Sequence, residues 1–212
     1  IVYLKSEDQS KVKNTGYTQT MVDDMLAAMP GLYYARPIGD HWAVGIGPNS
    51  ALGFGASGDD DWMGRYLMKE WSLMFVGIAP SVAYRVNDKL SIGASLPIVY
   101  SQFTLEKAVY NMSPGSSDGT FELTADGWGA GVNVGILYEL TEHTRFGLTY
   151  RSKVSVTEEG KPELSGLTEE RRELLNKFGV LKQDISVDTS TPQGVNAGVF
   201  HEFENGWSMS LD

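Results

Sequence analysis

Hydrophobic and polar residues alternate along residues 126–153, and the alternation predicts a β-hairpin. On the second arm, which follows a turn at residues 139–144, Phe146, Leu148 and Tyr150 share one face and polar residues share the other. A period of two is typical of strands rather than helices. On the first arm glycine and asparagine occupy the odd positions, and the even positions hold Trp128, Ala130, Val132, Val134, Ile136 and Tyr138.

Aromatic residues at the ends of these arms favour a membrane barrel over a soluble sandwich. Between Trp128 and Tyr138, ten steps of about 3.3 Å, tilted by about 40°, rise about 25 Å, the height of the apolar band of an outer-membrane barrel. Trp128 and Tyr150 would mark one membrane interface, and Tyr138 and Phe146 the other. A strand pair of a soluble β-sandwich is the alternative, but its solvated face would usually carry Lys, Glu and Thr where these arms carry glycine.

The spacing of the predicted strands supports the same fold class. Short turns at residues 38–41, 87–89, 139–144 and 204–206 alternate with long loops at 5–29, 55–70, 106–122 and 157–183. This sorting is typical of an all-β, transmembrane, antiparallel up-and-down β-barrel, with short periplasmic turns and long extracellular loops. A Greek-key sandwich has no reason to show it. We also expect short helices in the long loops, over residues 18–28, 62–67 and 168–178.

Composition narrows the class of protein further. The chain has 24 glycines among 212 residues, against a usual content of about 7%, and most lie inside strand-like runs. It has no cysteine, which excludes disulfides and thiolate metal sites. The net charge of −10 lies mostly in the long connections, and no basic cluster is present, so nucleic acid is not expected as a partner.

Two segments resemble the FadL-type outer-membrane channels, which take up long-chain fatty acids and other hydrophobic compounds. They are GWGAGVNVGILYELTEHTRFGLTYRSKV and SVAYRVNDKLSIGASLPIVYSQFTLEK, and they align with the fifth to seventh strands of that family. The resemblance implies a fourteen-stranded barrel in the outer membrane of a Gram-negative bacterium. Residues 1–212 would then be a partial barrel domain with strands one to about nine, the amino-terminal plug preceding Ile1 and the last strands following Asp212.

The resemblance also implies an external hydrophobic groove between the loops at residues 106–120 and 157–183. These acidic loops carry apolar residues that bury either against one another or against a lipid-like ligand. Lys107 lies where family members carry a basic residue, and a single cation among apolar walls suits a fatty carboxylate; a solvated loop lysine is the alternative. The candidate ligand-binding residues are Phe103, Leu105, Lys107, Val109, Tyr110, Met112, Leu174, Leu175, Phe178, Val180 and Leu181.

A second site implied by the resemblance is a lateral gate. In the family the third strand is kinked, and the kink opens a gap in the wall through which ligand leaves sideways into the bilayer. Here that strand contains Gly47, Pro48, Asn49 and Ser50. Proline lacks the N–H of the ladder and glycine contributes no packing, so strand pairing should break there. An ordinary bulge is the alternative.

The sequence offers little for catalysis. The three histidines lie beside short turns, and no G-x-S-x-G motif is present. Asp59, Asp60 and Asp61 lack the remaining ligands of a calcium loop. We expect no enzyme, no metal and no cofactor, but a monomeric passive channel whose partners are hydrophobic small molecules and outer-membrane lipid. Loops would capture the ligand, most of all long-chain fatty acids. The alternatives are a structural or adhesive outer-membrane barrel and a soluble lipocalin-like binder.

Overall fold

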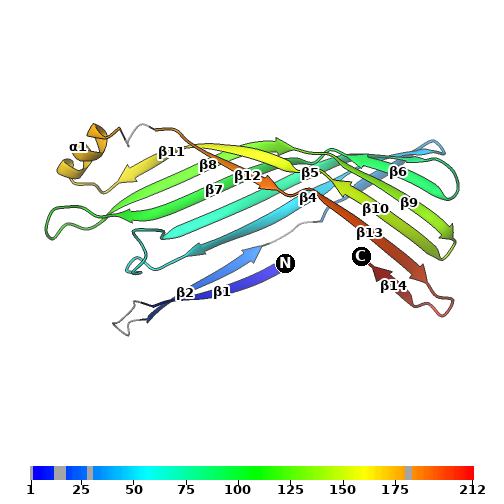
Figure 1. Ribbon diagram of the computed structural model, residues 1–212, viewed down its shortest axis with the longest axis horizontal. Helices are drawn as coiled ribbons and strands as arrows, with labels where there is room; N and C mark the ends of the chain where they lie inside the picture. Colours follow the sequence, from blue (N-terminus) through cyan, green and yellow to red (C-terminus); the bar gives the residue numbers. More distant parts are fainter. Residues whose placement is uncertain (1, 12–17, 28–30, 180–182) are drawn as a thin grey trace.

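A computed structural model describes residues 2–11, 18–27, 31–179 and 183–212 of the chain (Figure 1). Within these residues there are fourteen strands and one helix. Their bounds are β1 (Val2–Lys11), β2 (Thr18–Ala27), β3 (Tyr34–Ile38), β4 (Trp42–Ser57), β5 (Glu70–Arg85), β6 (Leu90–Ser95), β7 (Ile98–Val109), β8 (Gly119–Ala130), β9 (Asn133–Thr141), β10 (Thr144–Arg151), β11 (Val154–Ser165), α1 (Glu169–Lys177), β12 (Ile185–Thr191), β13 (Gly194–Glu202) and β14 (Ser208–Leu211).

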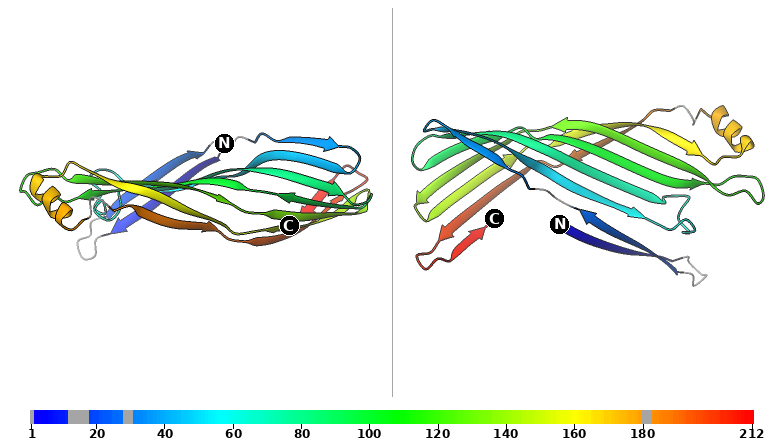
Figure 2. Two further views of the ribbon diagram at one scale, coloured as in Figure 1. Left: turned by 90° about the horizontal axis from the view of Figure 1, so that it is seen from above. Right: turned by 180° about the vertical axis from the view of Figure 1, so that it is seen from behind.

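Antiparallel pairing joins β3 to β14 into one sheet, and β1 and β2 pair separately. In this sheet β5 pairs with β4 on one side and with both β6 and β7 on the other. Four pairs of consecutive strands lie end to end as long strands: β6 with β7, β8 with β9, β10 with β11 and β12 with β13 (Figure 2). Sequence neighbours are therefore also neighbours in space, which is the up-and-down order that the loop lengths predicted.

The breaks between these end-to-end strands line up across the sheet, and we call this line the crease. It passes through residues 96–97, 131–132, 152–153 and 192–193. Few backbone bonds join neighbouring strands at this level: the N–H of Leu96 donates to Pro80 (2.9 Å), that of Gly131 to Pro97 (3.0 Å) and that of Ser152 to Val132 (2.9 Å). The crease divides the sheet into a loop half, with β7, β8, β11 and β12, and a turn half, with β6, β9, β10 and β13.

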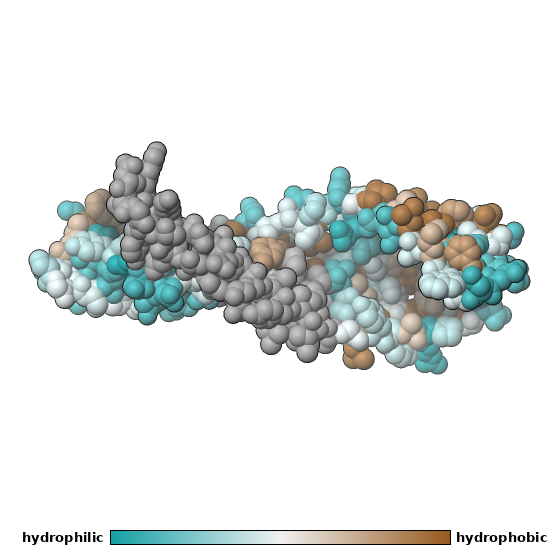
Figure 3. Space-filling model, turned by 90° about the horizontal axis from the view of Figure 1, so that it is seen from below, coloured by the Kyte–Doolittle hydropathy of each residue, from teal (hydrophilic) through white to brown (hydrophobic). Residues whose placement is uncertain are grey.

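In the turn half the two faces of the sheet carry different side chains. On the apolar face Val132, Val134 and Ile136 remain 48%, 45% and 47% exposed, so they are not sealed inside a water-soluble core. Hydrophobic surface gathers toward the turn end and hydrophilic surface toward the loop end (Figure 3). The opposite face, which we call the small-residue face, is formed by Gly45, Ser81, Ala83, Ser91, Gly93, Ser95, Asn133, Gly135, Gly147, Thr149, Arg151 and Asn196.

The same side of the sheet is filled in the loop half. Phe75, Val99, Val154 and Val156 form a buried cluster there, with Leu73 packed against it. The cluster comes from β5, β7 and β11, which β8 and the strand pairing bring together. Burial of these side chains supplies the main apolar core among the described residues.

Two predicted helices are wrong. Residues 18–27 form β2, which pairs with β1 from Val2–Ala27 to Lys11–Thr18; the helical spacing of the apolar residues there is overridden by pairing with the strand that precedes it. Residues 62–67 form successive turns rather than a helix, beginning with the N–H of Trp62 bonded to Asp59 (2.9 Å). The third predicted helix is confirmed as α1, with Thr168 as N-cap and Glu169 and Glu170 in its first turn.

The long arms differ from the prediction in two further ways. The first arm of the 126–153 hairpin is interrupted at residues 131–132, so Trp128 lies on β8 and Tyr138 on β9, which continues the same long strand. The predicted loop at 106–122 shrinks to residues 110–118, because β7 and β8 continue pairing up to Val109 and Gly119. Polar side chains do not stop a ladder whose backbone groups bond to each other. The turn between Tyr138 and Phe146 is where the sequence placed it, since these two residues face each other in the register.

Candidate ligand-binding site

The two loops predicted to flank a groove are held together at the loop end by the buried side chain of Asn111. Its amide nitrogen donates to the carbonyl oxygens of Ser117 and Gly166, both at 2.8 Å, and its Oδ1 accepts from the N–H of Thr168 at 3.1 Å. Thr168 is also the N-cap of α1. One side chain therefore fixes the β7–β8 loop against the start of the helix.

A third loop, residues 58–69, joins this cluster; the loop itself was predicted at residues 55–70, but its contacts with the other two loops were not. The Nε of Arg65 donates to Oδ2 of Asp118 (3.1 Å), and the hydroxyl of Tyr66 donates to the same oxygen (2.8 Å). The Asp118 hydrogen bond raises the pKa of both Arg65 and Tyr66 above their ordinary values. The backbone N–H of Ala108 on β7 donates to the carbonyl of Arg65 (2.8 Å), which pins the loop to the strand.

An ion-pair triad holds the base of the same loop. The Nζ of Lys69 lies 2.7 Å from Asp60 and 2.8 Å from Glu106 on β7. Hydrogen bonds to Asp60 and Glu106 raise the pKa of Lys69, and the hydrogen bond and charge of Lys69 lower the pKa of Asp60. The loop is therefore docked through charges that persist at neutral pH.

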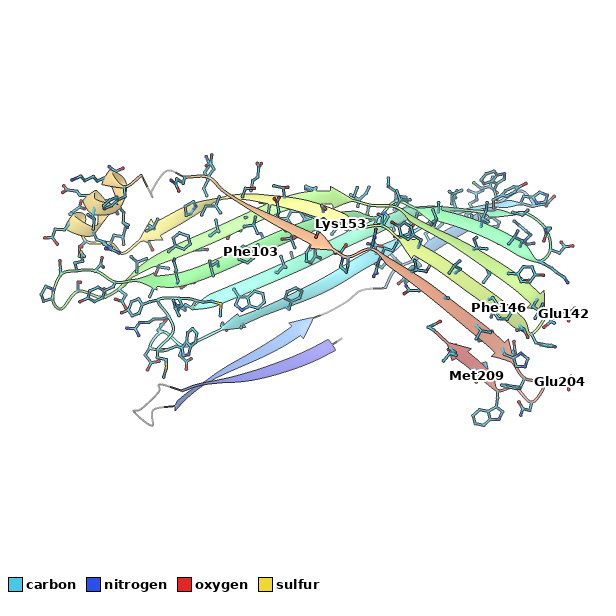
Figure 4. The ribbon with its side chains drawn as sticks, viewed as in Figure 1. Phe103, Glu142, Phe146, Lys153, Glu204 and Met209 are labelled. Carbon is cyan, nitrogen blue, oxygen red and sulfur yellow. The ribbon has the colours of Figure 1, made fainter. Side chains whose placement is uncertain are left out.

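The predicted ligand residues on β7 lie on the side of the sheet that carries the buried cluster. Phe103, Leu105, Lys107 and Val109 alternate along the strand and are half-buried; Figure 4 labels Phe103 in the loop half. The ammonium of Lys107 lies 4.9 Å from the centroid of the Phe121 ring. A cation over an aromatic face is attracted by the ring, so the Phe121 ring helps to position the ammonium of Lys107.

The remaining predicted ligand residues are less buried. Tyr110, Met112 and Phe178 are 60%, 61% and 70% exposed, whereas Leu174 and Leu175 on α1 are half-buried. The Tyr110 ring contacts the Tyr66 ring edge to face, with 6.4 Å between centroids. The structure therefore places apolar side chains at the surface of the loop end. Val180 and Leu181 lie outside the described residues.

The predicted gate residues form a bulge in β4. The β4–β5 register shifts between Pro48 and Ser50, so Asn49 has no partner on β5, but pairing resumes beyond it. On its other edge β4 pairs with β3 only from Trp42 to Ile46. The ring of Tyr33 lies against Gly47 so closely that a Cβ there would collide with it. Among the described residues, β4 beyond Ile46 is thus paired along one edge only.

An open hollow of about 700 Å³ lies over the small-residue face, and the site prediction missed it. Its lining includes glycine, alanine and serine from β4, β5, β6 and β9, together with Asn133, Leu137, Thr149, Arg151 and Asn196. Glycine content hinted at free space on this side, but the alternating pattern alone does not measure it.

Glu158 is a second residue that sequence reasoning missed. Its side chain is fully buried, and it accepts hydrogen bonds from the hydroxyls of Ser101 (2.6 Å) and Thr189 (2.9 Å). The carboxylate therefore bridges β7 and β12 from its place on β11, passing over Gly127 of β8. A bare backbone is needed there, because a Cβ on Gly127 would collide with the carbonyl of Thr157.

Neither a metal cluster nor a membrane-spanning helix occurs in the part of the chain that the structure describes. No group of three His, Asp or Glu side chains is placed to hold a metal ion there. No helix in these ranges is long and apolar enough to cross a membrane.

Sequence comparison finds relatives among outer-membrane proteins. The chain is 29% identical over 154 residues to a long-chain fatty acid transport protein of Escherichia coli O6:H1, covering 63% of this chain and 34% of that protein. It is 31% identical over 147 residues to a 47 kDa outer membrane protein of Pasteurella multocida, covering 64% and 34%. The chain thus spans about a third of the length of the curated relatives that it matches.

Solved structures show the same fold. A Pseudomonas aeruginosa FadL homologue superposes with a TM-score of 0.68 at 18% identity, over 92% of this chain and 48% of that one. The toluene transporter TbuX of Ralstonia pickettii gives 0.59 at 20% identity, over 97% and 58%. The chain is therefore part of a barrel of this type, and the predicted fold class is confirmed.

A match to a protein-family model completes the assignment. Residues 3–212 match the family described as outer membrane protein transport protein (OMPP1/FadL/TodX). Relatives named as outer membrane proteins come from Haemophilus influenzae and Pasteurella multocida, and the family is described as one of outer membrane proteins, which confirms the predicted outer-membrane location. The family is one of transport proteins rather than enzymes, as predicted. The chain belongs to the OMPP1/FadL/TodX family of outer membrane transport proteins.

Proposed function

We propose that this chain is part of a passive channel that takes up hydrophobic molecules through the outer membrane, with long-chain fatty acids as the first candidates. One relative is named a long-chain fatty acid transport protein and another a toluene transporter, so the class of ligand is apolar in both cases. In a transmembrane barrel the apolar face lies against lipid. The small-residue face then lines the lumen, and its hollow is part of the passage.

Capture is assigned to the loop end. Tyr110, Met112 and Phe178 expose apolar surface on otherwise polar loops, and exposed apolar patches rimmed by polar groups are typical of binding sites. Lys107 lies on β7 with Phe103 and Leu105, and its ammonium is held over the ring of Phe121 on β8. It would meet the carboxylate of a fatty acid. The docked loop at 58–69 would form one side of this site.

Lateral release is assigned to the bulge at Gly47, Pro48, Asn49 and Ser50. The observation that carries this step is the edge of β4, which beyond Ile46 has a ladder partner on one side only among the described residues. A gap along that edge would let an apolar tail pass from the lumen to the bilayer. Backbone groups at such an edge need other partners where they face lipid. We therefore place the gap only at the bulge and not along the whole length of β4.

Binding measurements on the full-length protein test the capture step. We expect Lys107→Ala to weaken oleate binding about tenfold, since a charge-assisted hydrogen bond is lost, and to leave toluene binding unchanged. Lys89→Ala is the matched control, because Lys89 lies in a short turn at the other end of the sheet. An unchanged oleate affinity in Lys107→Ala would remove Lys107 from the site.

The same binding measurements distinguish the alternative functions. A structural or adhesive barrel would bind neither oleate nor toluene, and its Lys107→Ala variant would behave as wild type. The soluble lipocalin-like binder finds no support in a chain that belongs to an outer-membrane family. A monomeric state stays a prediction, which the mass of the detergent-solubilised protein would check.

A further inference from the structure

Two pairs of aromatic rings bound the apolar face of the sheet. At the turn end the ring centroids of Trp42 and Tyr84 lie 4.7 Å apart, and toward the loop end those of Tyr100 and Trp128 lie 5.2 Å apart. On β5 the register partners of Trp42 and Tyr100 are Tyr84 and Val76, and eight steps of about 3.3 Å, tilted by about 40°, rise about 20 Å. Because such pairs are typical of barrel girdles, Trp42 and Tyr84 mark the head-group level at the turn end.

Arg36 on β3 is a charged residue on this apolar face. In the strand register it lies opposite Val44, and the same row continues through Val82 and Ala94 to Val134. Opposite residues in adjacent antiparallel strands share a face. The side chain of Arg36 is therefore on the side of the sheet that lies against lipid.

The depth of Arg36 sets it apart. It lies two residues from Ile38, which is opposite Trp42, so its backbone is about 5 Å to the hydrocarbon side of the girdle. In the described strands β3, β6, β9, β10, β13 and β14, the register places no other Lys, Arg, Asp or Glu on the apolar face. A charge on the lipid face is destabilising, but the long side chain of arginine can bend back to the interface.

Arg36 and its aromatic neighbours present donors without acceptors. Among the described residues its guanidinium has no hydrogen bond and no ion pair, not even with Asp40 in the adjoining turn. Trp42 is its diagonal neighbour on β4, about 7–8 Å away, which long side chains can bridge, and Tyr84 is opposite Trp42 on β5. The indole N–H and the phenol O–H are also without hydrogen-bond partners in the described ranges. A guanidinium matches phosphate with a fork of donors, so these three groups suit an anion at the girdle.

A second hollow favours a lipid as the source of this anion. It is open, has a volume of about 530 Å³ and lies on the apolar face, with Trp42 and Tyr84 in its lining. Ala94 is the smallest side chain in its row and lies between Val82 and Val134, which leaves space on this face. An apolar hollow that begins beside a group of donors suits an acyl chain attached to a phosphate.

We propose that Arg36, Trp42 and Tyr84 bind the phosphate of a phospholipid in the leaflet at the turn end, with one acyl chain in the hollow over Ala94. Free phosphate would meet the same donors, but only a lipid also fills the hollow. The site lies on the outside of the wall, so it is independent of the molecule that passes through the channel. Its failure would leave the proposed function standing.

Native mass spectrometry of the full-length protein in detergent tests the site. Two probes share their acyl chains and differ in the phosphate: dioleoylphosphatidylglycerol and dioleoylglycerol. We expect Arg36→Gln to weaken binding of the phospholipid about tenfold, since a charge-assisted hydrogen bond is lost, and to leave dioleoylglycerol binding unchanged. Arg36→Lys should retain part of the affinity. Arg85→Gln is the matched control, because Arg85 ends β5 opposite Ser91 on the small-residue face; it should change neither affinity.

The other outcomes count against the site. Unchanged phospholipid binding in Arg36→Gln, or an equal loss for both probes, overturns the assignment of the phosphate to Arg36. Displacement of the phospholipid by inorganic phosphate shows an anion site that does not require a lipid. Ala94→Leu should fill the hollow and weaken both probes, and normal binding by this variant overturns the acyl-chain position. Should Arg36→Gln lack the heat-dependent gel migration of a folded barrel, Tyr84→Phe must show the phosphate-selective loss instead.

Discussion

The loop half and the turn half of the sheet are built from the same antiparallel ladder, but they use one side of it differently. In the loop half that side is filled by Phe75, Val99, Val154 and Val156 and by the buried carboxylate of Glu158. In the turn half the same side carries glycine, alanine and serine around a hollow of about 700 Å³. Side-chain packing stabilises the first region, whereas the second depends on its backbone ladder.

The difference means that the packed side chains and the open hollow occupy different halves of the same wall. Packed side chains at the loop end would hold the capture loops in place, and the empty side at the turn end would let ligand pass. Glycines on the two sides of the crease therefore differ in the space around them. A Cβ on Gly127 or Gly160 of the loop half would collide with the backbone of a neighbouring strand, whereas Gly93 and Gly147 of the turn half have room for one.

The largest expected effect comes from placing the same side chain at a glycine in each half. A Cβ on Gly127 would collide with the carbonyl of Thr157, whereas on Gly93 its nearest neighbour would be the carbonyl oxygen of Val82, at 3.5 Å. We expect Gly127→Val to lower the free energy of unfolding by about 3 kcal/mol through overpacking, and Gly93→Val to leave it nearly unchanged. Urea unfolding in lipid vesicles measures both.

Equal loss of stability in these two variants would break the comparison, because it would mean that the hollow is as tightly packed as the loop half. Gly93→Val should instead reduce ligand uptake, since its side chain enters the hollow.

A smaller effect is expected from the buried carboxylate. Glu158→Ala removes the acceptor of two hydroxyl donors, the buried Ser101 and the half-buried Thr189; we expect a loss of about 2 kcal/mol in unfolding free energy. Glu159→Ala, one residue away on the exposed face, should have almost no effect. Denaturation of both variants under identical conditions decides whether Glu158 holds β7, β11 and β12 together.

The smallest effect is the pH dependence of the docked loop at 58–69. The pKa of Asp60 is lowered by Lys69, so its contribution is present above its ordinary value of 3.8 and is lost as the pH falls through the lowered value. The pKa of Tyr66 is raised by its hydrogen bond to Asp118, so that contribution is present below 10.0 and is lost as the pH rises through the raised value.

We therefore expect the loop to stay docked between these limits and to loosen beyond them. The fluorescence of Trp62, taken as the difference between wild type and Trp62→Phe, follows the loop across the pH range. Tyr66→Phe should remove the contribution of the tyrosine at the alkaline limit and leave the acid limit in place. A signal that does not change outside the window would show that the charges do not dock the loop.

Strand positions and the identity of the apolar face were predictable from the sequence, because alternation reports which side of a strand each residue faces. The exposed row Val132, Val134 and Ile136 lies where this pattern placed it. The interruption at residues 131–132 was not predictable. A missing ladder bond leaves the alternation of Trp128 and Val134 unbroken, so the pattern carries no trace of it.

The change of side between β10 and β11 was also not visible in the sequence. Odd-numbered residues of β10, such as Arg151, lie on the small-residue face, whereas on β11 the even-numbered Val154 and Val156 lie on that side of the sheet.

The site was predictable only in part for a related reason. Lys107 and Phe103 share a strand and could be paired by spacing, but Asn111 with Thr168 and Arg65 with Asp118 meet only because distant loops close at one end.

The crease has a mechanical consequence. Four neighbouring long strands are interrupted at the same level, and few backbone bonds join them there. We therefore expect the wall to bend more easily along this line than within either half, where the ladder is complete.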